Sequence, residues 1–256
     1  MKVIGDYHTH TIYSHGKGTI EENVLVAREK GLSVIGIADH GPGHRFYGVK
    51  RENFKVMRDE IDRLNELYDD IEILLGVEAN LLDFKGTLDI DENEIKYLDY
   101  IAAGYHFGIM PKNVGTAYSL YFQSKIMNMS NSTFENLKEK TTDSLIKAVE
   151  DYDIMFLSHP GAKVPVDVVR LNQACIENDT LLEVNGKHGY LTVDDLKLLK
   201  GLETKLILGS DAHSPHRVGE VAHCLDRVRA AGLDLKNIVN IESEGGSNGV
   251  NSNNRT

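Results

Sequence analysis

The chain has 256 residues, of which 41% are hydrophobic and 26% charged, and its formal net charge is -11. This composition excludes a disordered chain and suffices for one large domain or two small ones. The acidic balance argues against binding nucleic acid irrespective of sequence, because neutralising a phosphate backbone requires clustered lysine and arginine. No segment approaches the roughly 20 apolar residues that span a bilayer, and the N-terminus lacks a signal peptide's apolar centre. We therefore expect a cytoplasmic protein without nucleic-acid or membrane partners.

Short apolar runs rich in valine, isoleucine and leucine recur along the chain and predict strands. They span residues 2–7, 33–38, 71–77, 99–105, 153–158, 180–185 and 205–210. Successive residues in these runs are apolar, which indicates strands buried on both faces, as in a parallel sheet. Helical patterns alternate with them, over residues 19–30, 52–68, 132–151, 166–177, 193–200 and 216–231. This alternation predicts either a (βα) barrel or an open doubly wound sheet, and chain length does not choose between them.

No internal segment has the composition of a linker, so we expect a single domain over residues 1–242. Residues 243–256 contain one apolar side chain, Val250, and are expected to form a flexible tail because they cannot bury enough surface. Residues 118–129 suit a packing helix better than an aromatic lid over a pocket. Cys175 and Cys224 are too few for a disulfide framework or a thiolate zinc site, and their helical patterns predict buried, unreactive thiols.

The chain has eleven histidines and no tryptophan, and many of these histidines follow predicted strands. The metal-binding side chains at strand ends are His8, His10, His40, Glu78, His106, His159, Asp211 and His213. Only the strand that ends at Glu183-Val184-Asn185 lacks an obvious ligand. Because the carboxyl ends of parallel strands converge on one face, these side chains should meet in one pocket.

A single histidine at a strand end is more often a structural residue than a ligand, but this explanation fails for the whole set. Imidazoles and carboxylates gathered without counter-charge are costly to desolvate, whereas divalent cations compensate them. His8 and His10 lie two apart on a strand, so both point to one face and can bind one cation. His15, from a nearby loop, completes nine candidate ligands. At about three protein ligands per catalytic ion these imply three metals, and the donor set suits zinc, manganese or iron.

Six segments carry a family resemblance: Asp6-Tyr7-His8-Thr9-His10, Ala38-Asp39-His40-Gly41, Gly76-Val77-Glu78, the isolated His106, Ser158-His159-Pro160 and Gly209-Ser210-Asp211-Ala212-His213. In this order they resemble the motifs of the PHP (polymerase and histidinol phosphatase) family. The resemblance implies a distorted (βα)7 TIM-like barrel, with a trinuclear metal site at the carboxyl ends of the strands, and phosphoesterase activity. It also implies three sets of ligands, namely His8, His10, Glu78 and Asp211 for one ion, His15, His40 and His213 for a second, and Glu78, His106 and His159 for a third.

The expected function is that of a metal-dependent phosphatase that hydrolyses a small phosphomonoester with a metal-activated hydroxide. We expect three divalent transition-metal ions, zinc first, with manganese or iron as alternatives. Asp211 is the expected proton acceptor, while Asp6 and Asp39 are expected to orient ligand imidazoles. Arg217 and His188 are the expected contacts to the substrate, Arg217 because a guanidinium binds phosphate bidentately. Weaker candidates for this contact are Lys163, Lys187, His44 and Arg45.

Three alternatives accompany this expectation. Histidinol-phosphate phosphatases share the motif set, although they more often resemble Glu-His where this chain has Asp39-His40. A proofreading exonuclease is disfavoured because the chain has neither a polymerase domain nor a basic groove. A non-catalytic metal-binding regulatory module is disfavoured because all the ligand positions are present. The oligomeric state is not predicted.

Overall fold

Strands and helices alternate along the chain in the computed structural model, which describes residues 2–109, 131–243 and 246–247. The strands are β1 (Lys2–Val3), β2 (Gly5–Thr9), β3 (Val34–Ile37), β4 (Glu72–Asn80), β5 (Tyr100–Gly104), β6 (Ile154–Leu157), β7 (Leu181–Asn185), β8 (Leu206–Gly209), β9 (Ile241–Ser243) and β10 (Gly246–Ser247). The helices are α1 (Ile20–Glu29), α2 (Asn53–Leu67), α3 (Glu92–Ile95), α5 (Asn131–Asp151), α6 (Val168–Glu177), α7 (Val193–Leu198), α8 (Ala222–Ala231) and the short 3-10 helices η2 (Pro215–Arg217) and η3 (Leu235–Asn237). The segment 118–129, predicted to be a packing helix, lies outside the described residues.

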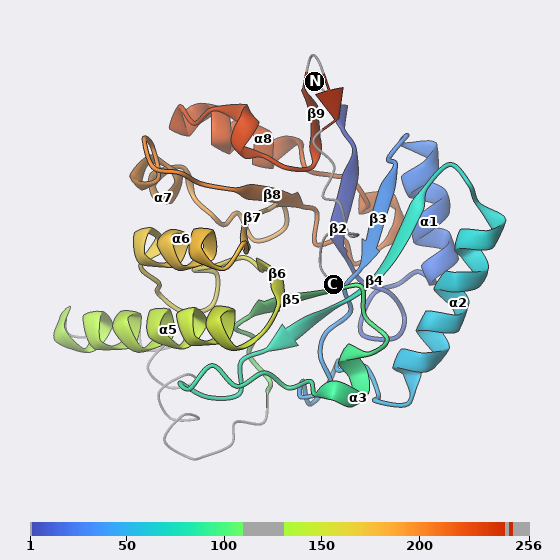
Figure 1. Cartoon of the computed structure of the whole chain (residues 1–256), viewed down its shortest axis with the longest axis horizontal. Coiled ribbons are helices and arrows are strands. Elements are labelled where there is room, and N and C mark those ends of the chain that lie inside the picture. The colour runs from blue at the N-terminus through green and yellow to red at the C-terminus, as the bar shows by residue number, and fades with distance from the viewer. Residues whose placement is uncertain (1, 110–130, 244–245, 248–256) are drawn as a thin grey trace.

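Parallel strands form the central sheet, in the order β2, β3, β4, β5, β6, β7 and β8. Its two edges meet where the chain leaves β8. There the amide of His10 donates to the carbonyl oxygen of Ala212 at 2.8 Å, and the amide of Ala212 donates to the carbonyl oxygen of His8 at 3.2 Å. The sheet is therefore a nearly closed seven-stranded barrel, which confirms the predicted barrel. Figure 1 shows α1 and α2 on one side of the strands and α5 to α8 on the other.

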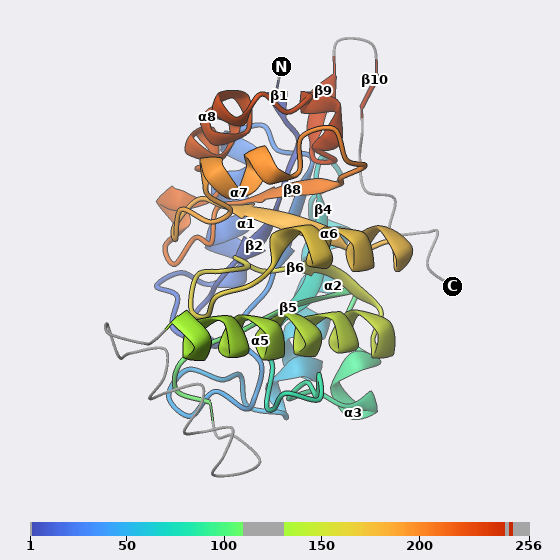
Figure 2. The same ribbon diagram turned by 90° about the vertical axis from the view of Figure 1, so that its left-hand side faces the viewer.

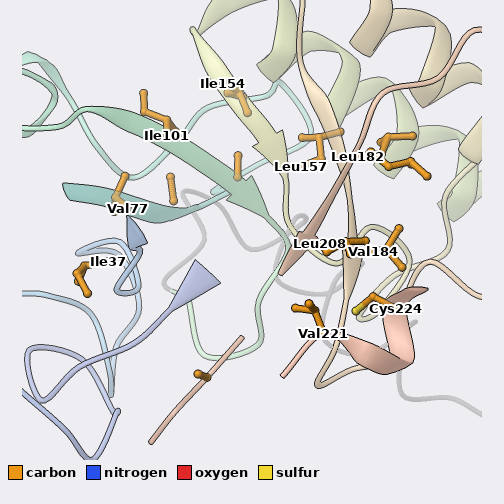
Figure 3. Close-up of a cluster of buried hydrophobic side chains, with 14 of the residues drawn as sticks. Ile37, Val77, Ile101, Ile154, Leu157, Leu182, Val184, Leu208, Val221 and Cys224 are labelled. Atoms are coloured by element: carbon orange, nitrogen blue, oxygen red, sulfur yellow. The ribbon is translucent and has the colours of Figure 1, made fainter. Parts of the chain in front are cut away.

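Side chains alternate between the inside and the outside of the barrel. Leu182 and Val184 of β7 belong to the large apolar cluster between the strands and the helices (Figure 3). The alternate residues of the strands point into the barrel. There Tyr7 of β2, Tyr100 of β5 and Phe156 of β6 belong to a second buried cluster. Both faces of the strands are thus buried, which explains why the apolar runs in the sequence are nearly continuous.

Both cysteines are buried, as predicted, Cys175 in α6 and Cys224 in α8. Burial raises the pKa of each thiol to about 12. Since the thiolate is the reactive form, neither cysteine is a candidate nucleophile or ligand.

The N-terminal run differs from the single predicted strand because it divides between two sheets. β1 pairs antiparallel with β9, with Lys2 opposite Glu242, and β10 pairs with the other side of β9. Figure 2 shows these three strands together at one end of the molecule. Ser243 and residues 246–247 are therefore in strands although the sequence predicted a tail from 243, because backbone pairing requires no apolar side chain. Residues 244–245 and 248–256 lie outside the described part of the chain.

Residues 216–231 form two helices, and the single predicted helix is wrong here. The 3-10 helix η2 ends at Arg217, and α8 begins only at Ala222. Between them Gly219 has φ +75, a left-handed conformation that interrupts a right-handed helix and that glycine adopts at little cost. None of the helices in the described ranges is long and apolar enough to cross a membrane.

Candidate metal centre

The strand ends bring the predicted ligands to one end of the barrel. His8 lies in β2 and His10 directly after it, and their rings are 5.1 Å apart. Glu78 lies in β4, where a parallel bridge places it beside His40 at the end of β3. The other predicted ligands follow three further strands of the same sheet, His106 after β5, His159 after β6, and Asp211 and His213 after β8.

Glu78 is the centre of this cluster. It is 1% exposed, and both of its carboxylate oxygens face imidazole nitrogens. The nitrogen–oxygen distances are 2.9 Å to His40 and His159, 3.0 Å to His106, 3.3 Å to His8 and 3.6 Å to His10. Oε1 faces His8, His106 and His159, while Oε2 faces His10 and His40. One carboxylate therefore contacts histidines assigned to different ions, which is the arrangement of a bridging ligand.

Asp211 supplies the second carboxylate of the cluster. Its Oδ1 lies 3.3 Å from His10 Nε2, 3.2 Å from His213 Nδ1 and 4.0 Å from His8 Nε2. Asp211 has φ +51 and His159 has φ +30, left-handed conformations that are uncommon for residues other than glycine. Such backbone conformations persist where the surroundings determine them, and both residues belong to the ligand cluster.

Four groups of three residues each bring their potential ligand atoms within 4.8 Å of one another. The groups are His8, His10 and Asp211; His10, His40 and His213; His40, Glu78 and His106; and His159, His188 and Asp211. His15 belongs to none of them, but its ring lies 4.1 Å from that of His213 and 4.9 Å from that of His40. All nine predicted ligands thus lie in one cluster. The partition differs from the one that the resemblance implies, since His10 groups with His40 and His213 where His15 was expected.

The buried nitrogens of this cluster test whether its residues fit metal ions. His8 Nε2, both ring nitrogens of His10, and His40 Nδ1 are buried and make no hydrogen bond. These nitrogens lie near carboxylate oxygens but make no hydrogen bond, which is unfavourable for buried polar atoms, and a bound cation would satisfy them. Imidazole with carboxylate, and without thiolate, is a donor set of zinc, manganese and iron sites. The residues therefore fit divalent transition metals.

The protonation states of Glu78, Asp211, His106 and His15 agree with that fit. Burial by itself raises the pKa of the Glu78 carboxyl, but the surrounding imidazoles, His106 first, hold this pKa well below its usual value. Burial likewise raises the pKa of Asp211, but His8, His10 and His213 outweigh burial and hold this pKa well below its usual value. Burial lowers the pKa of His106 and that of His15 to about 3, so both rings are neutral at pH 7. Metal binding needs ionised carboxylates and neutral imidazoles.

The sequence offered no role for Glu183, yet this residue contacts the cluster directly. Its Oε1 lies 2.6 Å from His8 Nδ1. Burial lowers the pKa of His8, but Glu183, followed by Glu78 and Asp211, outweighs burial and raises that pKa well above its usual value. The signal in the sequence was a charged residue inside an apolar strand, LLEVN, where burial requires a partner.

Asp6 and Asp39 hold backbone and loops rather than ligand rings. Asp6 accepts hydrogen bonds from the amides of His8 at 3.3 Å, Ser210 at 3.1 Å and Gly219 at 2.8 Å. Asp39 accepts from the amide of Thr11 at 2.7 Å, and its closest approach to a ring is 3.8 Å, to His10 Nδ1. Neither carboxylate makes a hydrogen bond to a ring of a predicted ligand, so the expected orientation of imidazoles is not seen. Asp6 and Asp39 instead connect the chain segments that carry the predicted ligands.

A cavity of about 170 Å³ opens onto the cluster. Besides predicted ligands, its lining includes His44, Tyr47, Phe107, Lys163, Lys187 and His188. The ammonium group of Lys187 lies 3.4 Å from Asp211 Oδ1 and 3.0 Å from His213 Nε2, and His188 Nε2 lies 3.5 Å from Asp211 Oδ2.

Arg217 lies away from this cavity, contrary to its expected place beside the substrate. It is not among the residues of the lining, and its Nε donates to Glu220 Oε2 at 3.0 Å. The reason is local, because η2 ends at Arg217 and the hydrogen bond to Glu220 holds its guanidinium three residues along the chain. Arg45, a weaker candidate for the same contact, is also absent from the lining.

Comparison with known proteins identifies the family. Residues 6–187 match the PHP domain. The chain belongs to the PHP-domain family. A probable phosphatase of Thermoanaerobacter sp. (strain X514) is 29% identical over 260 residues, which cover 94% of this chain and 92% of that protein. A probable phosphatase of Shewanella frigidimarina is 26% identical over 260 residues, which cover 95% and 91%.

The fold of this PHP-domain protein also has a counterpart among solved structures. Histidinol phosphate phosphatase of Lactococcus lactis, complexed with zinc, L-histidinol and phosphate, matches with a TM-score of 0.60 at 18% identity, over 90% of this chain and 94% of that one. This likeness shows the shared barrel. The match of residues 6–187 confirms the predicted family, and the relatives named probable phosphatases support the assignment to that class of enzymes.

Proposed function

We propose that this PHP-domain protein hydrolyses small phosphomonoesters at a centre of three divalent transition-metal ions. The observation that carries the proposal is the position of Glu78, whose two oxygens face five histidines within 3.6 Å at the wall of a cavity. A carboxylate shared in this way would hold several ions close together, and such ions can stabilise both the attacking and the leaving oxygen in the hydrolysis of a phosphate ester.

The nine predicted ligands would hold these ions. They are His8, His10, His15, His40, Glu78, His106, His159, Asp211 and His213. Bound ions would supply Lewis-acid activation of water and stabilise charge on the phosphoryl oxygens. Zinc is our first choice among the metals, and manganese and iron are the alternatives.

Asp211 is the proposed proton acceptor. It lines the cavity, is 3% exposed, and carries an ionised carboxylate because the neighbouring imidazoles hold its pKa low. An ionised carboxylate beside the reacting centre can hold a water by hydrogen bonding and accept its proton.

Lys187, Lys163 and His188 are the proposed contacts to the substrate phosphate. Among the described residues that line the cavity, the carboxylates are Glu78 and Asp211, and both would be occupied by metal ions. The two ammonium groups would then face an anionic substrate without competing protein carboxylates in the lining. Burial, followed by Lys187, lowers the pKa of Lys163, and a bound phosphate would relieve this unfavourable environment.

Metal-dependent hydrolysis of p-nitrophenyl phosphate tests the proposal. Protein purified without chelator should contain between two and three transition-metal ions per chain by elemental analysis and should release p-nitrophenol. A chelator should abolish this activity, and zinc or manganese should restore it. Less than one ion per chain would refute the trinuclear centre, and full activity after complete chelation would refute metal-dependent catalysis.

The leaving group is identified by a screen of purified phosphometabolites. Histidinol phosphate is one arm of this screen, because the barrel is shared with a histidinol phosphate phosphatase. Selective hydrolysis of histidinol phosphate would favour that narrower activity. Stoichiometric metal binding without turnover of any phosphomonoester would favour a non-catalytic metal-binding module instead.

A further inference from the structure

We propose that Glu183 is a positioning residue that holds two metal ligands at once, the imidazole of His8 and the backbone of His159. This inference rests on the proposed metal centre and adds to it a residue outside the nine ligands. Glu183 lies in β7 and is 0% exposed. Its neighbours Leu182 and Val184 pack toward the helices (Figure 3), so strand alternation directs its own side chain into the barrel.

Each oxygen of Glu183 accepts from a different partner. Oε1 lies 2.6 Å from His8 Nδ1. Oε2 accepts from the amide of His159 at 2.7 Å and from Asn185 Nδ2 at 3.0 Å. Two amide donors therefore converge on Oε2, which leaves Oε1 to face the imidazole of His8.

The contact with Oε1 selects the tautomer of His8. A carboxylate accepts hydrogen bonds, so the proposal places the hydrogen of this 2.6 Å contact on Nδ1. Nε2 is then the nitrogen available to a metal ion, and it faces Glu78 Oε1 at 3.3 Å and Asp211 Oδ1 at 4.0 Å. A carboxylate behind a ligand histidine fixes the orientation of the ring and raises its basicity.

The contact with Oε2 holds the backbone of His159. This residue has φ +30, a strained conformation for residues other than glycine, which persists only where the surroundings hold it. The hydrogen bond from its amide to Glu183 supplies such a restraint. In the held conformation His159 Nε2 lies 2.9 Å from Glu78 Oε1 and 3.2 Å from His106 Nε2. The family resemblance assigns His8 and His159 to different ions, so one carboxylate supports two positions.

Gly209 of β8 provides the space for this carboxylate. A Cβ atom at position 209 would lie 1.9 Å from Glu183 Oε1 and 3.0 Å from His8 Cβ. No side chain fits there while Glu183 keeps its contact with His8. Gly209→Ala therefore displaces Glu183 without removing its charge.

Glu183→Gln is the direct test, because glutamine keeps the size of the side chain but has one acceptor oxygen. It can accept from His8 or from His159, and its NH₂ group would then face the other donor. The affinity of the metal-free protein for zinc and for manganese is measured by competition with a chromophoric chelator. We expect about a 10- to 100-fold loss of affinity, the range found when a carboxylate behind a ligand histidine is removed.

Glu94→Gln is the matched control. Glu94 is 2% exposed, accepts from the amide of Asp91 at the start of α3 and from Arg51, and is neither a predicted ligand nor part of the cavity lining. Both variants remove a buried carboxylate, and circular dichroism and thermal unfolding compare the losses in stability. Loss of metal affinity in Glu183→Gln and Gly209→Ala, but not in Glu94→Gln, supports the proposal. Metal affinity equal to that of the wild type in all three variants overturns it.

Histidine ¹⁵N–¹H correlation spectra of the wild-type protein with zinc provide a measurement that does not depend on whether the variants fold. We expect His8 to be protonated at Nδ1, and protonation at Nε2 instead overturns the proposal. Wild-type hydrolysis of p-nitrophenyl phosphate is recorded in parallel. If the wild-type protein is active and Glu183→Gln binds zinc as tightly as the wild type, the positioning role of Glu183 is refuted and the phosphatase proposal is not. If the wild-type protein is inactive but Glu183→Gln binds zinc more weakly, the phosphatase proposal is refuted and the positioning role is not.

Discussion

Glu78→Ala is the substitution with the most consequences for this centre. Glu78 Oε1 faces His8, His106 and His159, and Oε2 faces His10 and His40. Removing the carboxylate leaves His106 and His159 as the remaining proposed ligands of one ion. Since a catalytic zinc has about three protein ligands, we expect this ion to be lost first.

The expected loss of activity follows from the transition-state stabilisation that a lost ion would no longer supply. Stabilisation of phosphoryl charge by a metal ion contributes several kcal/mol to the transition state. A loss of about 4 kcal/mol corresponds to about a thousand-fold decrease in kcat/KM. Loss of the bridging carboxylate should therefore reduce activity by at least about three orders of magnitude.

Elemental analysis and steady-state kinetics on p-nitrophenyl phosphate check this prediction together. The metal content of Glu78→Ala should fall by one ion or more per chain, and Glu94→Ala, which removes a buried carboxylate in α3, is the control for general destabilisation. Circular dichroism establishes that both variants fold. A folded Glu78→Ala protein with wild-type metal content and wild-type activity would show that Glu78 is not a bridging ligand.

The remaining predictions concern the substrate contact, stability against pH and metal loading. Lys187→Met should reduce kcat/KM by about 10- to 100-fold, which corresponds to the loss of one charge-assisted hydrogen bond. Arg217→Met removes a guanidinium outside the cavity and should leave kcat/KM unchanged. Equal effects of the two substitutions in steady-state assays would contradict the assignment of Lys187. Burial lowers the pKa of His106 to about 3 from its ordinary 6.5, so the unfolded chain takes up a proton that the folded one does not. His106 alone should therefore make the stability of the metal-free protein, measured by urea unfolding, fall by about 1.4 kcal/mol for each pH unit below 6.5, down to about pH 3. His15 and His10, whose pKa values burial also lowers, should make the fall steeper. Stability that is constant from pH 6.5 to 4 would refute a neutral, buried His106. Zinc at 100 times its dissociation constant should stabilise the folded chain by about 2.7 kcal/mol for each independent site, and a melting temperature that zinc does not change would exclude binding to the folded state.

Some features of the site follow from the sequence alone. The period-2 spacing of His8 and His10 places both on one face of a strand, whatever the strand's neighbours are. Glu78 and His159 follow apolar runs whose continuity predicts parallel strands, and parallel strands bring their carboxyl ends together. Local patterns and one topological rule were thus enough to bring together eight of the nine predicted ligands, with His15 added from a nearby loop. The ordered motifs were enough to recognise the family that the match of residues 6–187 confirms.

Contacts between distant residues needed the tertiary structure. Glu183 and His8 are 175 positions apart, so no local pattern connects them, and the glycine that makes room for Glu183 is explained only by the carboxylate on the neighbouring strand. Arg217 had the right chemistry for phosphate, but the turn that contains it carries the guanidinium to Glu220.

The sequence by itself determined which residues can bind metal and at which end of the barrel they gather, because strand periodicity and the polarity of parallel strands are local properties. Only the tertiary structure decided which ligands share a carboxylate, which cations line the cavity and which buried residue holds the ligands in place. The physical reason is that these depend on distances between side chains from different strands, and barrel closure sets those distances.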